Sequence, residues 1–416
     1  MFIRCCTSGR PYVSYRLLLS HLFRSRSEAA FCEQHGHAVL AGVARDVSAT
    51  FPVDLPVLAH HVERYPCKPA SVVFVTHVLD TAVRFVELVA STADIATIVA
   101  IPYSTTVTAR DKLCSHFDLL EPVTAADMMI AVSDAVRSAL TQSAERSVIV
   151  QEIGGYCASR IAQLARRANF GGVVEDTMQG HWRYQAIEDL ACPVLTIAES
   201  PLKALENRQV GRAIAYSLET ILRSRFFRIP VETRIGVLGY GGIGEGTAAS
   251  LAGMGARVLV YDPNPIRMAR AFVEGLNAQD RETVLREADV LLGVSGQRSI
   301  TADDVALMKD GAVLASGSSK RVELDVEGLC AAADDVTTEP GLTRLSIRGK
   351  TIWLVNDGTP INFADQGVLG HVLDLVYTEL YMCIRKLSEG TCRPGLQTLD
   401  IVEQEAIADV WRHIYS

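Results

Sequence analysis

The sequence predicts an α/β protein with two domains, each built on a mainly parallel sheet. The first observation behind this prediction is that short β-branched runs alternate with amphipathic helical patterns between residues 70 and 168, as in "ASVVFVTHVLDTAVRFVELVAS", and again between residues 205 and 360. Such alternation is typical of parallel sheets covered by helices on both faces. The second observation is the stretch "GVLGYGGIGEGTAASLAGMG", in which a strand, a glycine turn and a helix follow one another directly.

The first domain is expected to cover residues 28–204. Within it, "IATIVAIPYS" is a further buried strand, and "RSVIVQEIGGYCASRIAQLARRA" is a strand, a glycine pair and a helix. The preceding residues, 1–27, form a basic arm with five arginines and no acidic residue. This arm resembles an organellar transit peptide, but a start codon placed too far upstream, or an arm that packs on an oligomer neighbour, would have the same composition.

The second domain is expected over residues 205–360. Its first helix, "NRQVGRAIAYSLETILRSR", leads into the glycine turn, and strand–helix units continue through "ADVLLGVSG", "GAVLASGSS" and "TIWLVND". This layout predicts a complete Rossmann-type dinucleotide-binding domain. Residues 361–416 add two helical segments, which either return to the first domain or form an oligomer interface.

Composition narrows the class of protein further. The chain has 416 residues, of which 49% are hydrophobic and 6% aromatic, and its net charge is -8 without a basic stripe. These values argue against nucleic acid or a membrane as partner and favour a small-molecule ligand. Ten cysteines without zinc-ligand spacing predict reduced thiols and no metal site. No apolar run is long enough to span a membrane, so we expect a cytoplasmic protein.

The glycine turn predicts an NAD site. Gly239 makes the tight turn, Gly241 lets the backbone approach a pyrophosphate, and Gly244 packs the helix on the strand. Asp262 ends the next strand, where its carboxylate can bind the adenosine ribose and repel the 2′-phosphate of NADP, although Arg267 lies close by. The whole turn, which we expect to contact the cofactor, comprises Gly239, Tyr240, Gly241, Gly242, Ile243 and Gly244.

Beyond this turn the sequence resembles S-adenosylhomocysteine hydrolase. "GARVLVYDPNPIRMARAFVEG" keeps that family's layout of strand, acid, proline-isoleucine and helix, and "MKDGAVLASGSSKRVELD" aligns without a gap on its segment MKDxAIVxNxGHFDxEID. "EIGGYCA", "VVEDTMQGHWRY", "SPLKALENRQVG" and "PINFADQGVLGH" follow in the family's order. The resemblance implies a permanently held NAD, transient oxidation of a ribose hydroxyl, and a homo-oligomer.

The resemblance also implies a set of catalytic residues. Lys203 matches the catalytic lysine, Asp176 matches a substrate-binding glutamate, His77 matches a histidine of the substrate domain, and Glu206 replaces an aspartate with one residue missing between it and the lysine. Lys203 and Glu206 lie three apart on a predicted helix and so share a face. The lysine can deprotonate a sugar hydroxyl provided that burial lowers its pKa.

Further positions are implied on the cofactor side. Thr177 matches the first of three threonines that reach the nicotinamide end, although it could equally cap the next helix. Asn362 and His371 match cofactor-contacting residues, with two extra residues between them. The remaining cofactor positions implied by the aligned segments are Asn207, Ser318 and Ser319.

The sequence differs from the family at two positions where the family has residues that can transfer protons. Ile153 stands where the family has a catalytic aspartate, and Ser319 stands where it has a histidine. The ending "DVWRHIYS" also lacks the family's Lys/Tyr-bearing tail. Each general acid or base contributes about 100- to 10,000-fold in rate, so release of homocysteine is not expected to survive these losses.

Three functions are therefore compatible with the sequence. The first is an NAD-dependent enzyme that oxidises a secondary hydroxyl of a nucleoside or sugar-like substrate. The second is a catalytically silent protein that binds NAD or an adenosine ligand and acts through a partner. The third is a D-2-hydroxyacid dehydrogenase, which shares "GYGGIG" and "VYDP" but would carry an arginine in an Ala-Arg-Gly turn where this chain has "ASGSSKR".

Overall fold

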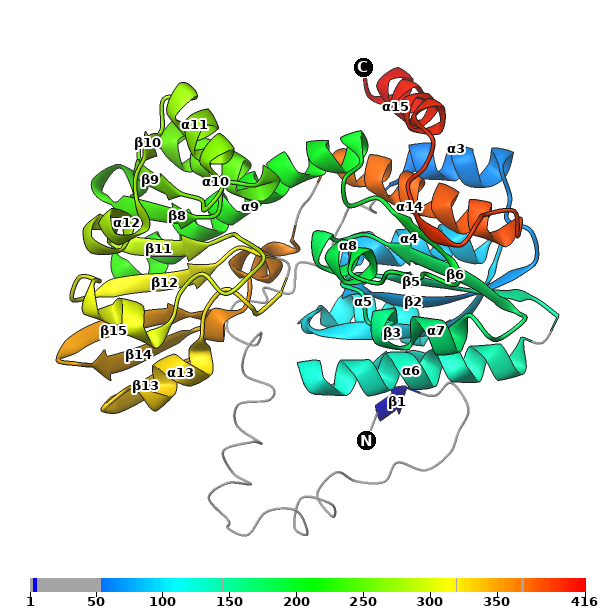
Figure 1. Ribbon diagram of the computed structural model, residues 1–416, viewed down its shortest axis with the longest axis horizontal. Coiled ribbons are helices and arrows are strands. Elements are labelled where there is room, and N and C mark those ends of the chain that lie inside the picture. The colour runs from blue at the N-terminus through cyan, green and yellow to red at the C-terminus, as the bar shows by residue number, and fades with distance from the viewer. Residues whose placement is uncertain (1–2, 6–53, 144, 319, 368–369) are drawn as a thin grey trace, which may run out of the picture. The chain divides into compact units, whose positions relative to one another are not determined.

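The computed structural model describes residues 3–5, 54–143, 145–318, 320–367 and 370–416 (Figure 1). The basic arm and Ser319 therefore lie outside the described residues, apart from the strand Ile3–Cys5. The chain forms two compact units, and each contains one sheet. Of the described residues, unit 1 holds 3–5, those within 54–206 and the C-terminal segment from residue 370, and unit 2 holds those within 207–367. The predicted two-domain α/β fold class, with a Rossmann-type domain, is confirmed.

The sheet of unit 1 has the strand order β1-β4-β3-β2-β5-β6-β7-β16. All neighbours pair in parallel except β1, which is antiparallel to β4. The strands are β1 (Ile3–Cys5), β2 (Ala70–Val78), β3 (Asp94–Thr105), β4 (Leu119–Glu121), β5 (Ser147–Glu152), β6 (Phe170–Glu175), β7 (Pro193–Thr196) and β16 (Gly395–Gln397).

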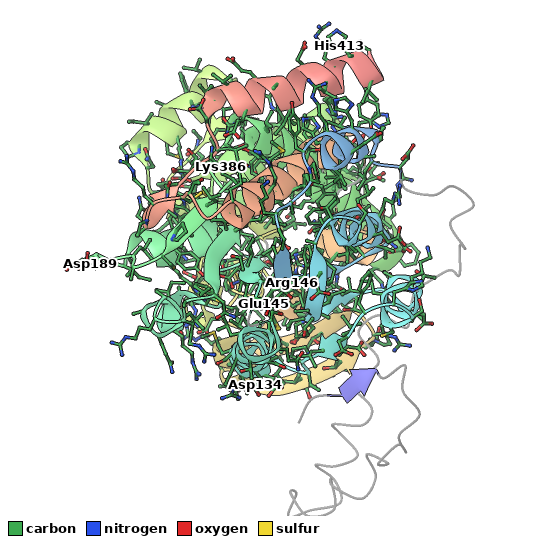
Figure 2. The ribbon with its side chains drawn as sticks, turned by 90° about the vertical axis from the view of Figure 1, so that its right-hand side faces the viewer. Asp134, Glu145, Arg146, Asp189, Lys386 and His413 are labelled. Atoms are coloured by element: carbon green, nitrogen blue, oxygen red, sulfur yellow. The ribbon has the colours of Figure 1, made fainter. Side chains whose placement is uncertain are left out.

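Helices cover both faces of this sheet. Alternate side chains of β2 show the two faces, since Val72 and Phe74 join one apolar core while Val73 and Val75 join the other. The first core is shared with α3 (Pro56–Arg64), α4 (Asp80–Ala90), α5 (Val107–Cys114), α14 (Val372–Ser388) and α15 (Ile401–Tyr415). The second is shared with α6 (Ala125–Gln142), α7 (Ile161–Leu164) and α8 (Met178–Gln185). Figure 2 shows α6 with Asp134 on one side of the sheet and α14 with Lys386 on the other.

The sheet of unit 2 has the order β10-β9-β8-β11-β12-β15-β14-β13, parallel from β10 to β15 and antiparallel beyond. Its strands are β8 (Arg234–Leu238), β9 (Arg257–Tyr261), β10 (Asn277–Ala278), β11 (Val290–Gly293), β12 (Ala312–Ser316), β13 (Asp335–Glu339), β14 (Leu342–Ile347) and β15 (Lys350–Val355). Its helices are α10 (Gly242–Gly253), α11 (Pro265–Val273), α12 (Arg281–Glu287) and α13 (Val326–Ala331). This is the alternation that the sequence predicts.

The boundaries of the units differ slightly from the expected ones. The helix α9 (Pro201–Phe226) is continuous, and the change from unit 1 to unit 2 falls inside it, between Glu206 and Asn207. Among the described residues, unit 2 extends to residue 367 and unit 1 resumes at residue 370, so residues 361–367 belong with unit 2. Both α14 and α15 pack within unit 1. In the described part of the chain, no helix has both the length and the apolar character needed to cross a membrane.

Candidate active site and cofactor site

Three neighbouring strands of unit 1 bring polar residues to one edge of the sheet. β5 ends at Glu152, β6 ends at Glu175, and β7 ends at Thr196. Because the strands are parallel, the loops that follow them lie at the same edge, where open α/β sheets bind ligands. Asp176 follows β6, and α9 with Lys203 starts just after β7.

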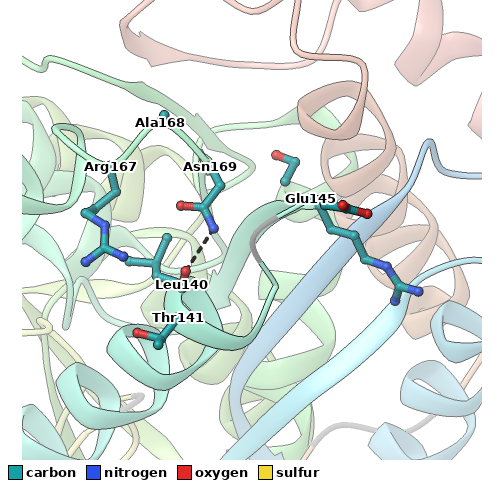
Figure 3. A pocket seen from close by; sticks show the side chains of 8 residues that line it. Leu140, Thr141, Glu145, Arg167, Ala168 and Asn169 are labelled. Carbon is teal, nitrogen blue, oxygen red and sulfur yellow. Dashed lines mark hydrogen bonds between the residues drawn. The ribbon is translucent and has the colours of Figure 1, made fainter.

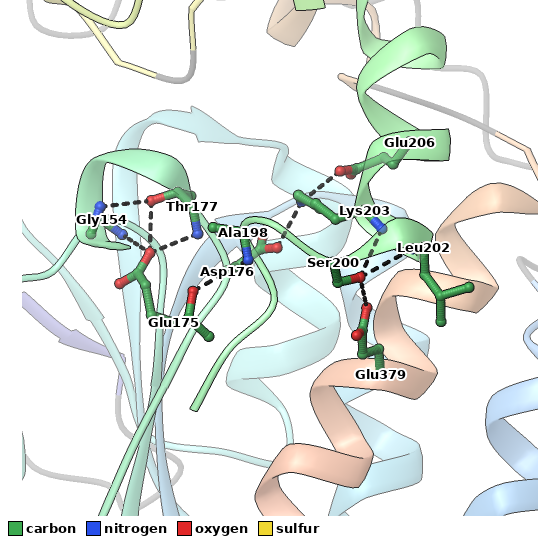
Figure 4. A network of polar contacts seen from close by, with 12 residues as sticks. Gly154, Glu175, Asp176, Thr177, Ala198, Ser200, Leu202, Lys203, Glu206 and Glu379 are labelled. Atoms are coloured by element: carbon green, nitrogen blue, oxygen red, sulfur yellow. Dashed lines mark hydrogen bonds and ion pairs between the residues drawn. The ribbon is translucent and has the colours of Figure 1, made fainter. Parts of the chain in front are cut away.

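Lys203 lies between two carboxylates at this edge (Figure 4). Its Nζ is 2.7 Å from Oδ1 of Asp176 and 2.5 Å from Oε2 of Glu206, and the three side chains are 12%, 17% and 10% exposed. Lys203 and Glu206 are three residues apart on α9, as the sequence predicts, while Asp176 comes from the loop after β6. The structure thus brings three of the four predicted catalytic residues into one buried cluster.

The surroundings of Lys203 favour its protonated form. Burial acts to lower the pKa of Lys203, but Asp176 and then Glu206 outweigh it, so the pKa lies above the ordinary value for lysine. The condition under which Lys203 itself would be the base, a pKa lowered by burial, is therefore not met. Burial also raises the pKa of Glu206, against the attraction of Lys203. The ammonium can donate a hydrogen bond to a substrate oxygen, and a carboxylate has to accept the proton.

A hydrogen-bonded group formed by Ser200, Glu379 and Gln404 adjoins this cluster, and the sequence did not predict it. The Ser200 hydroxyl accepts hydrogen bonds from the backbone N–H groups of Leu202 and Lys203 and donates to Oε2 of Glu379, 2.6 Å away. Gln404 donates to the other oxygen of Glu379 at 2.8 Å. Burial raises the pKa of Glu379 to about 6. A glutamate within the mainly apolar, buried face of α14 is the sequence signal that could have pointed to it.

Glu175 was also missed, and it fixes the loops around the cluster. Its two oxygens accept hydrogen bonds from the N–H groups of Gly154, Gly155 and Thr177 and from the Thr177 hydroxyl, at 2.7 to 2.8 Å. Burial, and then the neighbouring Glu152, raise the pKa of Glu175 to about 8. Gly180 lies so close that a Cβ there would be 2.0 Å from the Glu175 carboxylate carbon. A buried acid thus ties the glycine pair after β5 to the start of α8.

Thr177 and His77 have defined partners at the same edge. The Thr177 hydroxyl accepts from the N–H of Gly180 and caps α8, which is the alternative role that the sequence left open. The Nδ1 of His77, near the end of β2, is hydrogen-bonded to the Ser104 hydroxyl, and its ring centroid is 6.1 Å from that of Tyr103. The predicted ligand contacts of both residues stay predictions.

A hollow on unit 1 lies elsewhere. It has a volume of about 540 Å³ and is found where β5 and β6 begin, at the edge opposite the Lys203 cluster (Figure 3). The residues that line it are Leu140, Thr141, Glu145, Arg146, Ser147, Arg167, Ala168 and Asn169. It contains none of the predicted site residues, so the buried ionic cluster, and not this hollow, is the candidate active site.

The glycine turn of unit 2 has the geometry of a dinucleotide cradle. Gly239 has φ of 111° and packs on the backbone of Ser295, and a Cβ at Gly244 would be 2.1 Å from the carbonyl oxygen of Gly239. A Cβ at Gly241, in contrast, would meet only the Arg267 guanidinium, at 3.9 Å, among the described atoms. The space beside Gly241 is therefore open at the first turn of α10, whose N–H groups can bind a pyrophosphate.

The other predicted cofactor residues are distributed around this turn. Asp262 is 4% exposed, and its carboxylate accepts from the N–H groups of Tyr240 and Asn264 and from Arg267, 3.3 Å away. The Asn207 side chain packs on Gly242, since a Cβ there would lie 3.1 Å from it. The Tyr240 ring is buried and its hydroxyl donates to Glu274, so only its backbone faces Asp262. The Ser318 hydroxyl donates to the carbonyl of Lys320.

Asn362 supplies a further test of fit for NAD. Its side chain is 4% exposed, and its Oδ1 has no hydrogen-bond partner within the described residues. A buried carbonyl oxygen without a partner is costly, and a ligand that carries N–H groups, such as the nicotinamide carboxamide, would satisfy it. The glycine cradle, Asp262 and Asn362 therefore fit the cofactor that the sequence predicts.

Comparison with known proteins agrees with this geometry. Residues 219–367 match the NAD-binding domain of S-adenosyl-L-homocysteine hydrolase. The chain is also similar in sequence to members of the S-adenosylhomocysteine hydrolase family. Its resident cofactor is NAD.

Three relatives illustrate the divergence. The adenosylhomocysteinase of Sulfolobus acidocaldarius is 28% identical over 62% of this chain and 64% of its own length. The adenosylhomocysteinase of Thermotoga maritima is 30% identical over 53% of this chain and 56% of its own length. The S-inosyl-L-homocysteine hydrolase of Methanosarcina acetivorans is 29% identical over 54% of this chain and 56% of its own length. The chain thus matches less than two thirds of the length of each.

Proposed function

We propose that this protein is an NAD-dependent enzyme that oxidises a secondary hydroxyl of a nucleoside or sugar-like substrate and is not a true S-adenosylhomocysteine hydrolase. The observation that carries the proposal is the Lys203 ammonium held between Asp176 and Glu206 in a buried cluster. Bound NAD supplies the hydride acceptor. The chain's own residues have to bind the alcohol, orient it and remove its proton.

The cluster is suited to these tasks. An ammonium has three N–H donors, and Asp176 and Glu206 engage two of them, so the third can donate to the substrate oxygen. Loss of the hydroxyl proton requires a nearby base, and Glu206 is the better candidate because burial raises the pKa of its carboxyl group. Asp176, at the loop after β6, can accept a hydrogen bond from a neighbouring hydroxyl of the substrate.

The proposal that homocysteine is not released rests on Ile153. Ile153 stands at the family's aspartate position, is 6% exposed and packs in an apolar cluster, so it offers no proton at the carboxyl end of β5. Elimination and addition of water need such a group, whereas oxidation of the alcohol needs only the Lys203 cluster and NAD.

The test is reduction of the bound cofactor. The purified protein is mixed with adenosine, S-adenosylhomocysteine, S-inosylhomocysteine and free ribose, and absorbance at 340 nm and free thiol are recorded. We expect reduction without stoichiometric thiol release, and we expect Lys203→Met to abolish it. The matched control is Lys386→Met, which breaks a lysine–glutamate pair of the same length, 2.5 Å, between α14 and α15. Full reduction by the Lys203 variant would refute the proposed site.

A catalytically silent binding protein is the second candidate, and the burial of Ile153 favours it. In that case NAD stays oxidised with every compound tested, while the wild-type protein still retains it. Stoichiometric thiol release from S-adenosylhomocysteine would instead show that the full hydrolase reaction persists despite Ile153.

A further inference from the structure

Two buried polar atoms of unit 2 have no hydrogen-bond partner among the described residues. One is Oδ1 of Asn362, and the other is Oγ of Ser316, a residue that is fully buried. An unpaired carbonyl or hydroxyl group in a protein interior costs free energy, and native proteins contain few of them. A ligand group that pairs with both atoms would remove this cost.

The two residues lie close together at the same end of one sheet. Ser316 is the last residue of β12, and its backbone forms a parallel bridge with Pro360. Asn362 follows Pro360 by two residues, a length of chain that spans about 7 Å at most. One small ligand group can therefore reach both side chains.

The strand order places this end of β12 beside the glycine turn. From β8 the sheet extends to β9 and β10 on one side and to β11 and β12 on the other. Dinucleotides bind where the strand order reverses, which here is between β8 and β11. The glycine turn follows β8, and Asp262 follows β9. The nicotinamide half of NAD is therefore expected at the ends of β11 and β12, where Ser316 is in register with Gly293.

We propose that Ser316 and Asn362 together bind the carboxamide of the nicotinamide. A primary amide carries one carbonyl oxygen and two N–H donors. The Ser316 hydroxyl donates to the carbonyl oxygen, and Oδ1 of Asn362 accepts from the amide nitrogen, so one ligand group satisfies both buried atoms. The pair holds the ring in one orientation, as hydride transfer requires.

This inference goes beyond the proposed function, because it concerns unit 2 alone and does not depend on the substrate. The family resemblance implies cofactor contacts for Asn362 and for His371, which lies in unit 1, but none for Ser316. The Ser316 contact follows instead from its unpaired hydroxyl and from its place on the sheet.

The test uses two NAD analogues that differ from NAD only at the carboxamide. Acetylpyridine adenine dinucleotide has a methyl group in place of the amide nitrogen, and thionicotinamide adenine dinucleotide has sulfur, a weak acceptor, in place of the carbonyl oxygen. The full-length protein is equilibrated with an equal mixture of NAD and one analogue, and the bound nucleotides are quantified by mass spectrometry. We expect the wild type to prefer NAD about tenfold over each analogue, since each leaves one buried group unpaired.

Variants assign the two ends of the carboxamide. Ser316→Ala should lose most of the preference against the thionicotinamide analogue and keep the preference against the acetylpyridine analogue. Asn362→Ala should show the reverse pattern. Ser250→Ala is the matched control, because the Ser250 hydroxyl already donates to the carbonyl of Gly246 at 2.7 Å, and this variant should keep both preferences.

The melting temperature distinguishes a ligand contact from a structural role of Ser316. Ser316→Ala removes a hydroxyl that has no partner among the described residues, so the NAD-free variant should melt at least as high as the NAD-free wild type. The rise in melting temperature that NAD causes should be smaller in the variant. A hydroxyl that supports the fold would instead give a lower melting temperature without NAD.

Three outcomes would overturn the proposal. If Ser316→Ala keeps the full preference against the thionicotinamide analogue, the hydroxyl binds water only. If the wild type takes both analogues as readily as NAD, the carboxamide has no specific partner. If Ser316→Ala loses affinity for all three nucleotides equally, its role is structural. None of these outcomes bears on the proposed active site, which Lys203→Met tests separately.

Discussion

The Lys203 ammonium lies 2.7 Å from the Asp176 carboxylate and 2.5 Å from the Glu206 carboxylate, so one buried cation is shared by two buried anions. Each carboxylate stabilises the protonated lysine, and together they leave the cluster with one excess negative charge. In the proposed reaction the lysine would therefore act as the hydrogen-bond donor, and one of the carboxylates would accept the proton.

Asp176→Asn should slow proton transfer while the substrate can still bind. The amide can still accept a hydrogen bond, but Lys203 keeps only Glu206 as an ionised partner and its pKa falls. We expect the rate of cofactor reduction by a reactive compound to drop about 100-fold or more, as for the loss of a group that assists proton transfer. The measurement is stopped-flow absorbance at 340 nm. Glu403→Gln, which breaks the Lys386 pair, is the control, and an equal loss in both variants would contradict the prediction.

Glu379 should make stability depend on pH. Burial raises the pKa of this carboxyl group from 4.5 to about 6, so the folded state favours the protonated form. The contribution of Glu379 to the free energy of unfolding is fully present below pH 4.5 and is lost as the pH rises through about 6. Glu379→Gln does not titrate, and a flip of the Gln404 amide would restore both hydrogen bonds.

We therefore expect the free energy of unfolding of Glu379→Gln, relative to wild type, to rise by about 2 kcal/mol between pH 4 and pH 7.5. Urea unfolding followed by circular dichroism measures this difference. Glu405→Gln, at an exposed position of α15, should show no such trend. A constant difference for Glu379→Gln would mean that the Glu379 carboxyl titrates normally.

Two glycines of the turn should respond differently to the same substitution. At Gly244 a Cβ would be 2.1 Å from the carbonyl oxygen of Gly239, so Gly244→Ala should lower the melting temperature of the protein even without cofactor. At Gly241 φ is -80°, which alanine adopts freely, and the Cβ would meet no described atom closer than 3.9 Å. Gly241→Ala should fold normally and bind NAD at least about tenfold more weakly, because the Cβ enters the space for the pyrophosphate. Calorimetry with and without NAD distinguishes the two effects, and undiminished NAD binding by Gly241→Ala would place the pyrophosphate elsewhere.

Local patterns were sufficient to predict some features and not others. The alternation of strands and helices, the glycine turn with Asp262, and the shared helix face of Lys203 and Glu206 all follow from short-range spacing. The contacts of Glu379 with Ser200, 179 residues away, and of Asp374 with Val57, 317 residues away, depend on how distant helices pack. The pKa of Lys203 could not be predicted either, because its sign depends on Asp176, which comes from another loop.

The ion pair between Asp262 and Arg267 predicts how cofactor choice can be changed. The carboxylate is 3% exposed and repels a 2′-phosphate, while the Arg267 guanidinium, 3.3 Å away and half exposed, is the group that could bind one. Asp262→Asn removes the repulsion and frees the arginine, so the ratio of NADP to NAD affinity should rise about tenfold to a hundredfold. Asp262→Asn also perturbs the hydrogen bonds from Tyr240 and Asn264, but this cost affects both cofactors equally and cancels in the ratio. In the double variant with Arg267→Ala the increase should largely disappear. Isothermal titration with both cofactors measures the ratio, and an increase that persists without Arg267 would mean that another group binds the phosphate.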